Sequence, residues 1–433
     1  MNKTLSSQTL TWLVVLFVVP MPMVLSLSLQ VSTLYLGNLL PIQLGVVAYA
    51  WMLAAVYLAT RPHWLDRLVG LPHLYIIHGS IALLAIVAAF AHKELTTSSG
   101  LIKQTGDLSL ILLIALGCWS MVFMAGWLTS RIKVLAEIKA FVERLAHHEL
   151  SVWLHRLNLV AVILVFIHVQ LISYISGLSW FMAIFDTMTF AVLLAYVIEK
   201  IRVRASSFSG TLTSNLEIAP SVHQLQIKLN MPQDVTWQAG DFAFLRFPDN
   251  SGMREYHPFS IVNAPRRVSR SHSSNQPRTW VFAIRRDGDF TRSLSSVAPG
   301  ARVEALAPFG RFQRFIEEHG PDVPIVIIAG GIGVTPMVSI AERFGSRIEA
   351  FVYTARRGSL LPYADDLRHR MRANGATTII QDRRLTTRQM NSVLVRRAIY
   401  LVAGPAGMQR AWIGFLRDNQ VAADHIYCEP FAW

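Results

Sequence analysis

The sequence has few charged residues and almost no cysteine. Only 15% of its 433 residues are charged, whereas a soluble globular domain carries about 25%. That shortage excludes an ordinary soluble enzyme and a disordered protein. Two cysteines, Cys118 and Cys428, are too few to build a disulfide framework or a cysteine-ligated zinc site.

The chain also lacks any dense run of basic residues, although its net charge is +13. Lysine and arginine are spread along the whole length, so nucleic-acid binding explains this charge poorly, and we expect no nucleic-acid partner. Cofactors that carry phosphate groups, together with the excess of basic residues in cytoplasmic loops of membrane proteins, explain it better.

Charge is distributed unevenly between the two halves of the chain. Residues 1–204 contain 13 basic and 8 acidic residues, mostly between long apolar runs, whereas residues 205–433 contain 27 basic and 19 acidic residues. The second density is normal for a soluble protein. The sequence therefore predicts a membrane half joined to a soluble half, which excludes a pure membrane channel.

Six apolar stretches are long enough to cross about 30 Å of hydrocarbon, which takes about 20 residues each. They lie near residues 11–29, 39–59, 74–92, 108–128, 155–176 and 180–199. The first differs from a cleaved signal peptide because it follows a single basic residue, Lys3, and contains Pro20 and Pro22. We therefore expect an uncleaved first helix and a six-helix transmembrane bundle.

The basic residues of this half indicate its orientation. The loops at 60–73 and 129–154 and the segment that begins at Lys200 hold most of them: Arg61, Arg67, Arg131, Lys133, Lys139, Arg144, Lys200, Arg202 and Arg204. The opposite side holds only Lys93 and Lys103. Because cytoplasmic loops carry the excess of Lys and Arg, we expect a multi-pass protein of the plasma or inner membrane. The N-terminus and the soluble half would both be cytoplasmic.

Four histidines lie inside the predicted spans, where ionisable residues are costly and indicate function. His78 and His92 are fourteen residues apart in the third span, and His155 and His168 are thirteen apart in the fifth. Fourteen residues of ideal helix rise about 21 Å and leave the two rings about 40° apart, on one face. Because the third and fifth spans run in the same direction, His78 can meet His155 near one membrane surface, and His92 can meet His168 near the other.

Two stacked pairs of histidines match the geometry of two haems, each with two axial histidines. The haems would be b-type, since the chain has no Cys-x-x-Cys-His attachment motif. Thirteen residues leave the rings of the fifth span about 140° apart, so the pairing requires a bulge or a different tilt in that span. The alternative is that the four are interior histidines hydrogen-bonded to backbone carbonyls, or interfacial ones.

The soluble half changes from alternating strands to a strand–helix pattern. Short alternating runs such as 225–229 and 242–247, separated by turn residues, predict a small antiparallel β-barrel. After about residue 320, buried-strand runs at 325–329, 348–354 and 399–403 alternate with helical segments. That alternation predicts a parallel α/β sheet.

Three motifs in this half suit a flavin and a nucleotide. His257-Pro258-Phe259-Ser260 offers a rigid apolar wall and a hydroxyl, although an ordinary strand end is an equal alternative. Gly288-Asp289-Phe290-Thr291 opens a predicted helix and could bind a pyrophosphate or simply cap the helix. Gly330-Gly331-Ile332-Gly333-Val334-Thr335-Pro336 follows an apolar strand and precedes a helix, a favourable site for a dinucleotide pyrophosphate. Arg356 and Arg357 follow the second predicted strand and favour the 2′-phosphate of NADPH over NADH.

Together these residues resemble the ferric reductase and NADPH oxidase family, in particular its compact prokaryotic members. The resemblance covers nearly the whole chain. It implies a six-helix transmembrane ferric-reductase-like haem domain at 1–204 and an antiparallel β-barrel FAD domain at 205–318. A parallel α/β domain that binds NAD(P)H would follow at 319–433. The implied cofactors are FAD, two b-type haems and NADPH, with NADH possible.

The resemblance also implies residue roles. His78, His92, His155 and His168 would be the haem ligands, while Ser260, Glu429 and Phe431 would have catalytic roles at the flavin. Trp433 is the alternative to Phe431 for stacking on the ring. Cofactor contacts would come from the family motifs and their neighbours: His257, Pro258, Phe259, Ser260, Gly288, Phe290, Thr291, Gly310, Gly330, Gly331, Gly333, Thr335, Pro336, Arg356, Arg357, Gly404, Pro405 and Phe431.

Two departures from the family pattern affect the expected chemistry. Ala403 stands where the family usually has cysteine before Gly404-Pro405, so no catalytic thiol is expected there. The second span also lacks the basic residue that superoxide-producing oxidases place between their haems. The identity of the external acceptor therefore stays open between oxygen, which would give superoxide, and ferric chelates.

The predicted function is transmembrane electron transfer from cytosolic NADPH through FAD and two haems to an external small-molecule acceptor. The chain would thus be an NAD(P)H oxidase or ferric-chelate reductase-type enzyme with the lipid bilayer around it and no obligatory protein partner. The rival hypothesis is a membrane-anchored flavin reductase that feeds a protein or quinone partner. A transporter with proton-relaying histidines would leave the flavin and nucleotide motifs without a purpose.

Overall fold

The computed structural model describes residues 7–32, 37–123, 134, 137, 148–205, 207–232, 235–265 and 278–429. Within them the chain divides into two compact units. The first contains residues 7–65 and 71–202, and the second contains residues 66–70 and 203–429. The boundaries predicted at 204 and 318 stay predictions.

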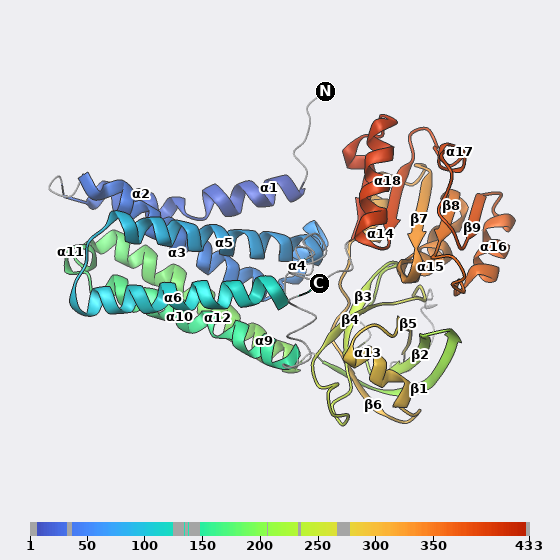
Figure 1. Ribbon diagram of the computed structural model, residues 1–433, viewed down its shortest axis with the longest axis horizontal. Coiled ribbons are helices and arrows are strands. Elements are labelled where there is room, and N and C mark those ends of the chain that lie inside the picture. Colours follow the sequence, from blue (N-terminus) through green and yellow to red (C-terminus); the bar gives the residue numbers. More distant parts are fainter. Residues whose placement is uncertain are drawn as a thin grey trace. The chain divides into compact units, whose positions relative to one another are not determined.

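The first unit is built entirely from helices in the described residues (Figure 1). In chain order they are α1 (Ser7–Leu13), a π-helical turn η1 (Val14–Val18), α2 (Met21–Gln30), α3 (Leu39–Ala59), α4 (His63–Val69), α5 (Leu71–Leu95), α6 (Gly100–Phe123), α9 (His148–Arg156), α10 (Asn158–Gln170), α11 (Ser173–Ser176) and α12 (Ser179–Ala205). Residues 66–69 of α4 and 203–205 of α12 belong to the second unit. Pro20 and Pro22, which lack the amide hydrogen that an uninterrupted helix needs, lie at the interruption between η1 and α2.

Among the described residues, six helical segments are long and apolar enough to cross a membrane, as the sequence predicts. They are Ser7–Gln30, Leu39–Ala59, Leu71–Leu95, Gly100–Phe123, Trp153–Gln170 and Ser179–Arg202. Large apolar side chains such as Phe17, Val87, Ile111 and Phe190 are exposed on them, which is the arrangement expected for a surface that faces lipid. The orientation across the membrane stays a prediction.

Helix α3 is central to the first unit. More than half of the most apolar stretch of this helix is buried (56%), whereas 28% or less is buried in each of the other five spans described. Its Tyr49 stacks on Phe185 of α12 with 4.7 Å between the ring centroids. Because α3 packs along α5, the two helices form a fixed frame for the histidines that α5 carries.

The fifth span is interrupted at Leu157, between α9 and α10. The Leu157 amide donates to the Leu154 carbonyl at 3.0 Å, and the Val160 amide donates to the Leu157 carbonyl at 2.9 Å. These bonds join residues three apart, as in a 3₁₀ turn, which changes the angle between side chains before and after it. The irregularity expected between His155 and His168 is therefore present.

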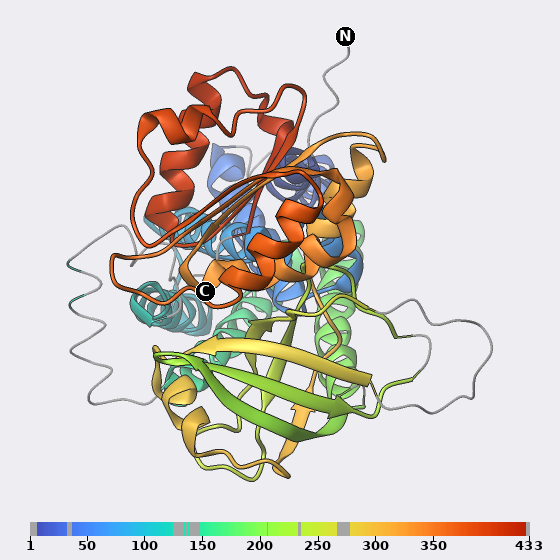
Figure 2. The ribbon, with the colours of Figure 1, turned by 90° about the vertical axis from the view of Figure 1, so that its right-hand side faces the viewer.

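The second unit begins with a six-stranded antiparallel sheet (Figure 2). Its strands are β1 (Phe208–Ala219), β2 (Val222–Leu229), β3 (Phe242–Arg246), β4 (His257–Ser260), β5 (Arg278–Arg285) and β6 (Arg302–Ala305), in the order β4-β3-β6-β1-β2-β5. Alternate residues such as Leu225, Ile227 and Leu229 of β2 are buried in one apolar cluster. This period of two is the pattern from which the strands were predicted.

The predicted barrel is not closed in the described residues, because β4 and β5 remain the two edges of the sheet. The edges meet at one point just beyond β4. Ile261 forms an isolated bridge with Phe282, and the Val262 amide donates to the Val281 carbonyl at 2.8 Å. The correct description is an antiparallel sheet that curves until its edges touch, since β4 is too short to form a full ladder with β5.

The chain then forms a five-stranded parallel sheet, as predicted. Its strands are β7 (Ile325–Gly330), β8 (Ile348–Thr354), β9 (Thr377–Gln381), β10 (Ile399–Ala403) and β11 (Ile426–Cys428), in the order β11-β10-β7-β8-β9. Helix α13 (Asp289–Ser293) lies between β5 and β6 of the antiparallel sheet. The helices between and beside the parallel strands include α14 (Phe312–Glu318), α15 (Val334–Phe344), α16 (Ala364–Ala373), α17 (Thr387–Asn391) and α18 (Ala406–Asp418). Apolar residues of α15 and α18 belong to two different core clusters, so helices cover both faces.

The strand order reverses between β7 and β10. The chain proceeds from β7 to β8 and β9 on one side, then crosses to β10 and β11 on the other. Ligands of open α/β sheets bind at such a switch point, outside the carboxyl ends of the strands. Those ends are Gly330 and Ala403, each of which belongs to a predicted nucleotide-binding motif.

Candidate functional site

The first histidine pair joins α5 to α9. The rings of His78 and His155 lie edge to face, with 5.9 Å between their centroids and planes inclined by 64°. Two imidazoles that bind one iron from opposite sides need about 6 Å between centroids, since each metal–nitrogen bond is about 2 Å long. The observed spacing therefore leaves room for a metal ion between these two rings.

The second pair, His92 and His168, lines one cavity that is partly open to solvent. Glycines make room for both rings. A Cβ atom on Gly45 would lie 2.9 Å from Nδ1 of His92, and one on Gly106 would lie 3.1 Å from the same atom of His168. Any larger residue at these positions would have to displace the imidazoles.

Three of the four histidine rings are oriented by a hydrogen bond from Nδ1 to a backbone carbonyl oxygen. Nδ1 of His78 contacts the Ala55 carbonyl oxygen at 2.9 Å. The corresponding atoms of His92 and His168 contact the carbonyl oxygens of Pro41 and Ile102, both at 2.8 Å. Because a carbonyl oxygen only accepts, each of these Nδ1 atoms carries the hydrogen.

His155 reaches the same state through a side chain. The Ser120 hydroxyl donates to the Leu116 carbonyl at 2.7 Å, so its oxygen is left to accept from Nδ1 of His155 at 2.8 Å. In all four rings Nε2 therefore has its lone pair available, and no Nε2 atom of the four has a hydrogen-bond partner among the described residues. This is the arrangement in which a metal-binding histidine is oriented by its other nitrogen.

The predicted flavin motif forms strand β4, all four residues of which are half-buried. Phe290, from α13, packs beside it, with its ring centroid 4.2 Å from that of His257 and 5.7 Å from that of Phe259. The Ser260 hydroxyl has no hydrogen-bond partner in the described part of the chain. The strand thus presents an apolar wall and one hydroxyl that remains available for a ligand.

The second predicted flavin segment caps a short helix. The Thr291 hydroxyl accepts from the amides of Asp287 and Gly288 at 2.8 and 2.9 Å, and it donates to the Gly288 carbonyl at 3.0 Å. The hydroxyl is therefore already used within the turn. Any contact of Thr291 with a pyrophosphate would have to share these bonds or replace them.

The glycine-containing turns after β7 and β10 pack directly against each other. A Cβ atom on Gly333 would lie 2.6 Å from the Ala403 carbonyl oxygen, and one on Gly330 would overlap Sδ of Met408. Gly404 has φ +156°, and a Cβ there would come within 3.1 Å of Gly330 Cα. Only glycine allows this close approach, and it brings the predicted nucleotide motifs to one edge of the sheet.

The remaining predicted nucleotide residues divide into buried and exposed ones. The Thr335 hydroxyl is buried and donates to the Ile332 carbonyl at 2.9 Å, so it holds the motif's own turn. Pro336 is buried in the first turn of α15. Arg356 and Arg357 follow β8 and are both exposed, where a phosphate group could reach them.

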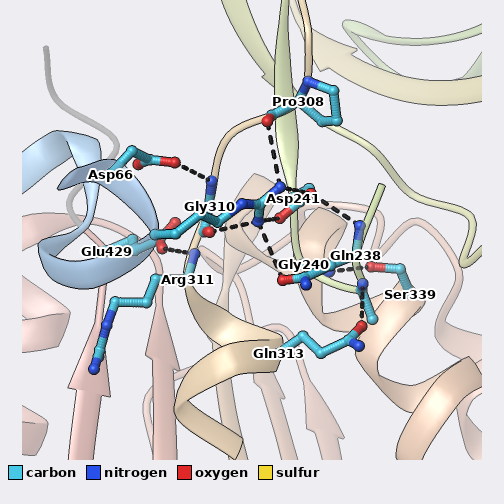
Figure 3. Close-up of polar contacts among 12 residues, drawn as sticks. Asp66, Gln238, Gly240, Asp241, Pro308, Gly310, Arg311, Gln313, Ser339 and Glu429 are labelled. Atoms are coloured by element: carbon cyan, nitrogen blue, oxygen red, sulfur yellow. Dashed lines mark hydrogen bonds and ion pairs between the residues drawn. The ribbon is translucent and has the colours of Figure 1, made fainter. Parts of the chain in front are cut away.

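A buried network of acidic residues surrounds the turn at Gly310, one of the predicted cofactor contacts (Figure 3). Asp66, Asp241 and Glu429 are each 2% exposed or less. Oδ2 of Asp66 accepts from the Gly310 amide at 3.1 Å, and Oε1 of Glu429 accepts from the next amide, that of Arg311, at the same distance.

One guanidinium balances part of this negative charge. Arg67 donates to both carboxylate oxygens of Asp241, at 2.7 and 2.9 Å. It also donates to the carbonyl oxygens of Gly310 and Pro308, at 2.7 and 3.3 Å. Gly310 has φ +136°, and a Cβ there would lie 2.8 Å from Oδ1 of Asp241, so the network requires glycine at this turn.

Burial dominates the electrostatics of the network. Desolvation raises the pKa of the Asp241 carboxyl to about 6 despite the ion pair with Arg67. Desolvation also raises the pKa of Glu429 to about 8, although it accepts hydrogen bonds from Tyr427, at 2.7 Å, and from the Arg311 amide. Glu429 therefore holds a proton at neutral pH. Burial raises the pKa of the Cys428 thiol to about 11, so this cysteine is not a thiolate.

Sequence reasoning placed Glu429 and Gly310 at the site but missed Asp66, Arg67 and Asp241. Arg67 was noticed only as a cytoplasmic basic residue. Its partner Asp241 is 174 residues away in the chain, and no local pattern connects the two. The predicted flavin-stacking residue Phe431 and its alternative Trp433 lie outside the described residues.

The curated proteins compared below each match less than half of this chain. No family model matches the chain. The chain is 27% identical over 176 residues to the electron transfer subunit of dihydroorotate dehydrogenase B from Streptococcus thermophilus, which covers 40% of this chain and 61% of that protein. It is 27% identical over 153 residues to NADPH oxidase 1 from Mus musculus, which covers 34% and 23% of the two chains.

A flavohemoprotein from Rhodopirellula baltica is 32% identical over 144 residues, or 29% of this chain and 34% of that protein. The chain thus spans less than two thirds of the length of each of these relatives. The chain is thus similar, over part of its length, to an electron transfer subunit, an NADPH oxidase and a flavohemoprotein.

Solved structures show only weak likeness. The flavohemoglobin from Malassezia yamatoensis matches 94% of this chain and 98% of its own, with 13% identity and a TM-score of 0.48. The flavohem-like FAD/NAD-binding domain of nitric oxide dioxygenase from Vibrio cholerae matches 52% and 98%, with 18% identity and a TM-score of 0.42. Neither likeness is strong enough to support a conclusion about this chain.

Proposed function

We propose that this protein is an oxidoreductase that carries electrons across a membrane, from cytosolic NADPH through FAD and two b-type haems to an external acceptor. The observation that carries the proposal is the common state of four intramembrane histidines. Each has Nδ1 fixed by an oxygen atom and Nε2 available, in two pairs on helices of a six-span bundle. They precede a reductase module in the same chain.

The donor set of each pair fits haem better than a bare metal ion. No group of three or more His, Cys, Asp or Glu side chains that could hold a metal ion occurs among the residues that the structure describes. Two histidines alone leave most coordination positions of a metal ion to other donors. Haem supplies four nitrogen atoms of its own and needs only axial ligands from the protein, so His78 with His155 and His92 with His168 would each complete one site.

An unpartnered polar atom belongs to the residue that precedes Ser120, the hydrogen-bond partner of His155. Nε1 of Trp119 is buried and has no hydrogen-bond partner among the described residues. Trp119 precedes Ser120, whose hydroxyl orients His155. A haem carboxylate that accepted from this indole would satisfy an otherwise costly buried donor.

In the second unit, the residues at hand fit a flavin and a nicotinamide nucleotide. Strand β4 and Phe290 would support the flavin ring, and the Ser260 hydroxyl would bond to it. The glycine turns at 330–333 and 404 would hold the nucleotide at the switch point between β7 and β10. When bound, NADPH and FAD supply hydride transfer, and haem iron supplies one-electron steps.

Glu429 would act as a buried carboxyl that stays protonated at neutral pH. Its carboxyl is 2% exposed and has Tyr427 and the Arg311 amide as donors. A neutral, buried acid at the end of β11 keeps negative charge away from a site that must bind anionic nucleotides. Arg356 and Arg357 would provide the positive charge for a 2′-phosphate.

The first test is to quantify haem and FAD in the purified protein and to record its spectrum after reduction with dithionite and with NADPH. We expect two b-type haems and one FAD per chain, with both haems reduced by NADPH in the absence of oxygen. One haem or none would contradict the proposal and favour the rival hypothesis, a membrane-anchored flavin reductase that feeds a protein or quinone partner.

A second test addresses the order of the sites. His92→Leu should remove one haem and stop reduction of an acceptor outside sealed vesicles, while NADPH still reduces the flavin. His63→Leu, in the same unit but in neither pair, is the matched control and should keep both haems. Full reduction of the outside acceptor by the His92→Leu protein would refute the two-haem path.

A further inference from the structure

Three charged side chains meet at the exposed end of the cavity that His92 and His168 line. Nζ of Lys93 lies 2.9 Å from Oδ1 of Asp107, and Nζ of Lys103 lies 2.5 Å from Oδ2 of the same residue. The side chains of Lys93, Lys103 and Asp107 are 45%, 56% and 27% exposed. One carboxylate therefore bridges two ammonium groups and leaves one net positive charge.

These lysines are unusual for their place in the chain. They are the two basic residues predicted on their side of the membrane, the side that normally carries few. Both line the same cavity rather than being spread over the surface. The remaining charged residue of this turn, Glu94, is exposed and does not line the cavity.

The lining of the cavity combines exposed polar residues with buried apolar ones. Thr96 and Ser98 line it together with the lysines, whereas Leu27, Tyr49 and Phe185 in its wall are buried apolar or aromatic residues. A ligand that fits such a space has an apolar body and anionic groups at one end. Ammonium groups held in fixed positions favour carboxylates there.

We propose that Lys93 and Lys103 form a carboxylate-binding site at the polar end of this cavity, with Asp107 as the positioning residue that holds them together. Two sources could supply the carboxylates: the propionate groups of a haem held by His92 and His168, or an anionic ferric chelate that serves as the external acceptor. The proposal deepens the proposed function and rests on it, because it assumes that electrons leave the protein near this histidine pair.

The test compares Lys93→Gln and Lys103→Gln with Glu94→Gln, which changes the charge of the same turn outside the cavity. Three quantities are measured on the purified protein: the midpoint potentials of its haems, equilibrium binding of radiolabelled ferric citrate, and the KM for ferric citrate relative to that for oxygen. Glu94→Gln should leave all three unchanged.

If haem propionates are the ligand, each lysine variant should lower the potential of one haem or release it, without a change in ferric citrate binding. If the external chelate is the ligand, each variant should weaken ferric citrate binding and raise its KM by about fivefold, with unchanged haem potentials and oxygen KM. Lysine variants that match Glu94→Gln in every measurement would overturn the proposal.

Asp107→Asn separates positioning from net charge. It adds one positive charge to the site, so a purely electrostatic attraction would strengthen ferric citrate binding or raise the haem potential. If Asp107 positions the lysines, its loss should shift the affected quantity in the same direction as the lysine variants. A shift in the opposite direction would overturn the positioning role.

The same measurements separate this inference from the proposed function. If the wild-type protein holds two haems and the lysine variants change nothing, only the inference fails. If the wild-type protein holds no haem, the proposed function fails, while the ferric citrate binding assay still decides whether the lysines bind carboxylates.

Discussion

Replacing Glu429 with glutamine tests the role of a buried acid in the stability of the second unit. The change keeps the size of the side chain and leaves an oxygen atom that can accept from the Arg311 amide and the Tyr427 hydroxyl. It removes only the ability to ionise. The pH dependence of unfolding should therefore report the titration of this one group.

The expected magnitude follows from the pKa of Glu429, which burial raises from 4.5 to about 8. A carboxyl with a raised pKa stabilises the fold while it is protonated, and this stability is lost as the pH rises from about 4.5 towards 8. One pKa unit corresponds to about 1.4 kcal/mol. Glu429 should therefore lower the free energy of unfolding by about 3 kcal/mol between pH 5 and pH 7, whereas glutamine should contribute no such loss.

The assay is urea unfolding of the detergent-solubilised protein at several pH values, followed by pulse proteolysis that reports the folded fraction of the second unit. With a urea m-value of about 3 kcal/mol per M, the wild-type midpoint should fall by about 1 M more than that of Glu429→Gln over this range. Glu349→Gln, an exposed carboxyl of β8, is the control and should follow the wild type. A parallel fall in all three proteins would refute the reasoning.

Three further predictions concern single contacts. Ser120→Ala removes the oxygen that accepts from His155 and should weaken haem retention about 10- to 100-fold, measured by transfer of haem to apomyoglobin; unchanged retention would contradict this role. Gly333→Ala should raise the KM for NADPH about tenfold or more by forcing the turns after β7 and β10 apart, with unchanged FAD content. Arg67→Leu leaves Asp241 buried without its cation, so it should destabilise the second unit by about 3–5 kcal/mol in the urea assay above pH 6. A smaller loss at pH 5, where Asp241 is protonated, is part of that expectation.

Composition and periodicity were sufficient to predict the architecture. Uninterrupted apolar runs of about 20 residues predict helices that cross a membrane, because backbone groups in lipid must be satisfied within the segment. Alternation with a period of two predicts β2, and the buried run before Gly330 predicts β7. These are local properties of the chain, and the structure has all of them.

Closure of the predicted barrel was wrong for a non-local reason. Strand number and length can be read from sequence, but closure depends on whether edge strands meet over a full ladder. In the described residues, the backbone pairing between the two edges is confined to Ile261 and Val262, just beyond the short β4. No pattern within either strand could show this.

The histidine positions were visible in the sequence because they are ionisable residues in apolar runs. Their state was not. The carbonyl groups that fix three of the rings belong to backbone atoms of Pro41, Ala55 and Ile102, which carry no side-chain signal. Glycines at 45 and 106 could have been noticed as small residues in spans, but only the packed helices show that they face imidazole rings.

The sequence by itself determined which residues can carry the chemistry: four intramembrane histidines, a hydroxyl in an apolar strand, and glycines where strands meet helices. Tertiary structure alone decided which distant groups share an environment. It enclosed Asp66, Asp241 and Glu429 with a single arginine, and it placed Lys93, Lys103 and Asp107 at one cavity. Burial and proximity between residues far apart in the chain set these charges and contacts, and neither quantity is a property of local sequence.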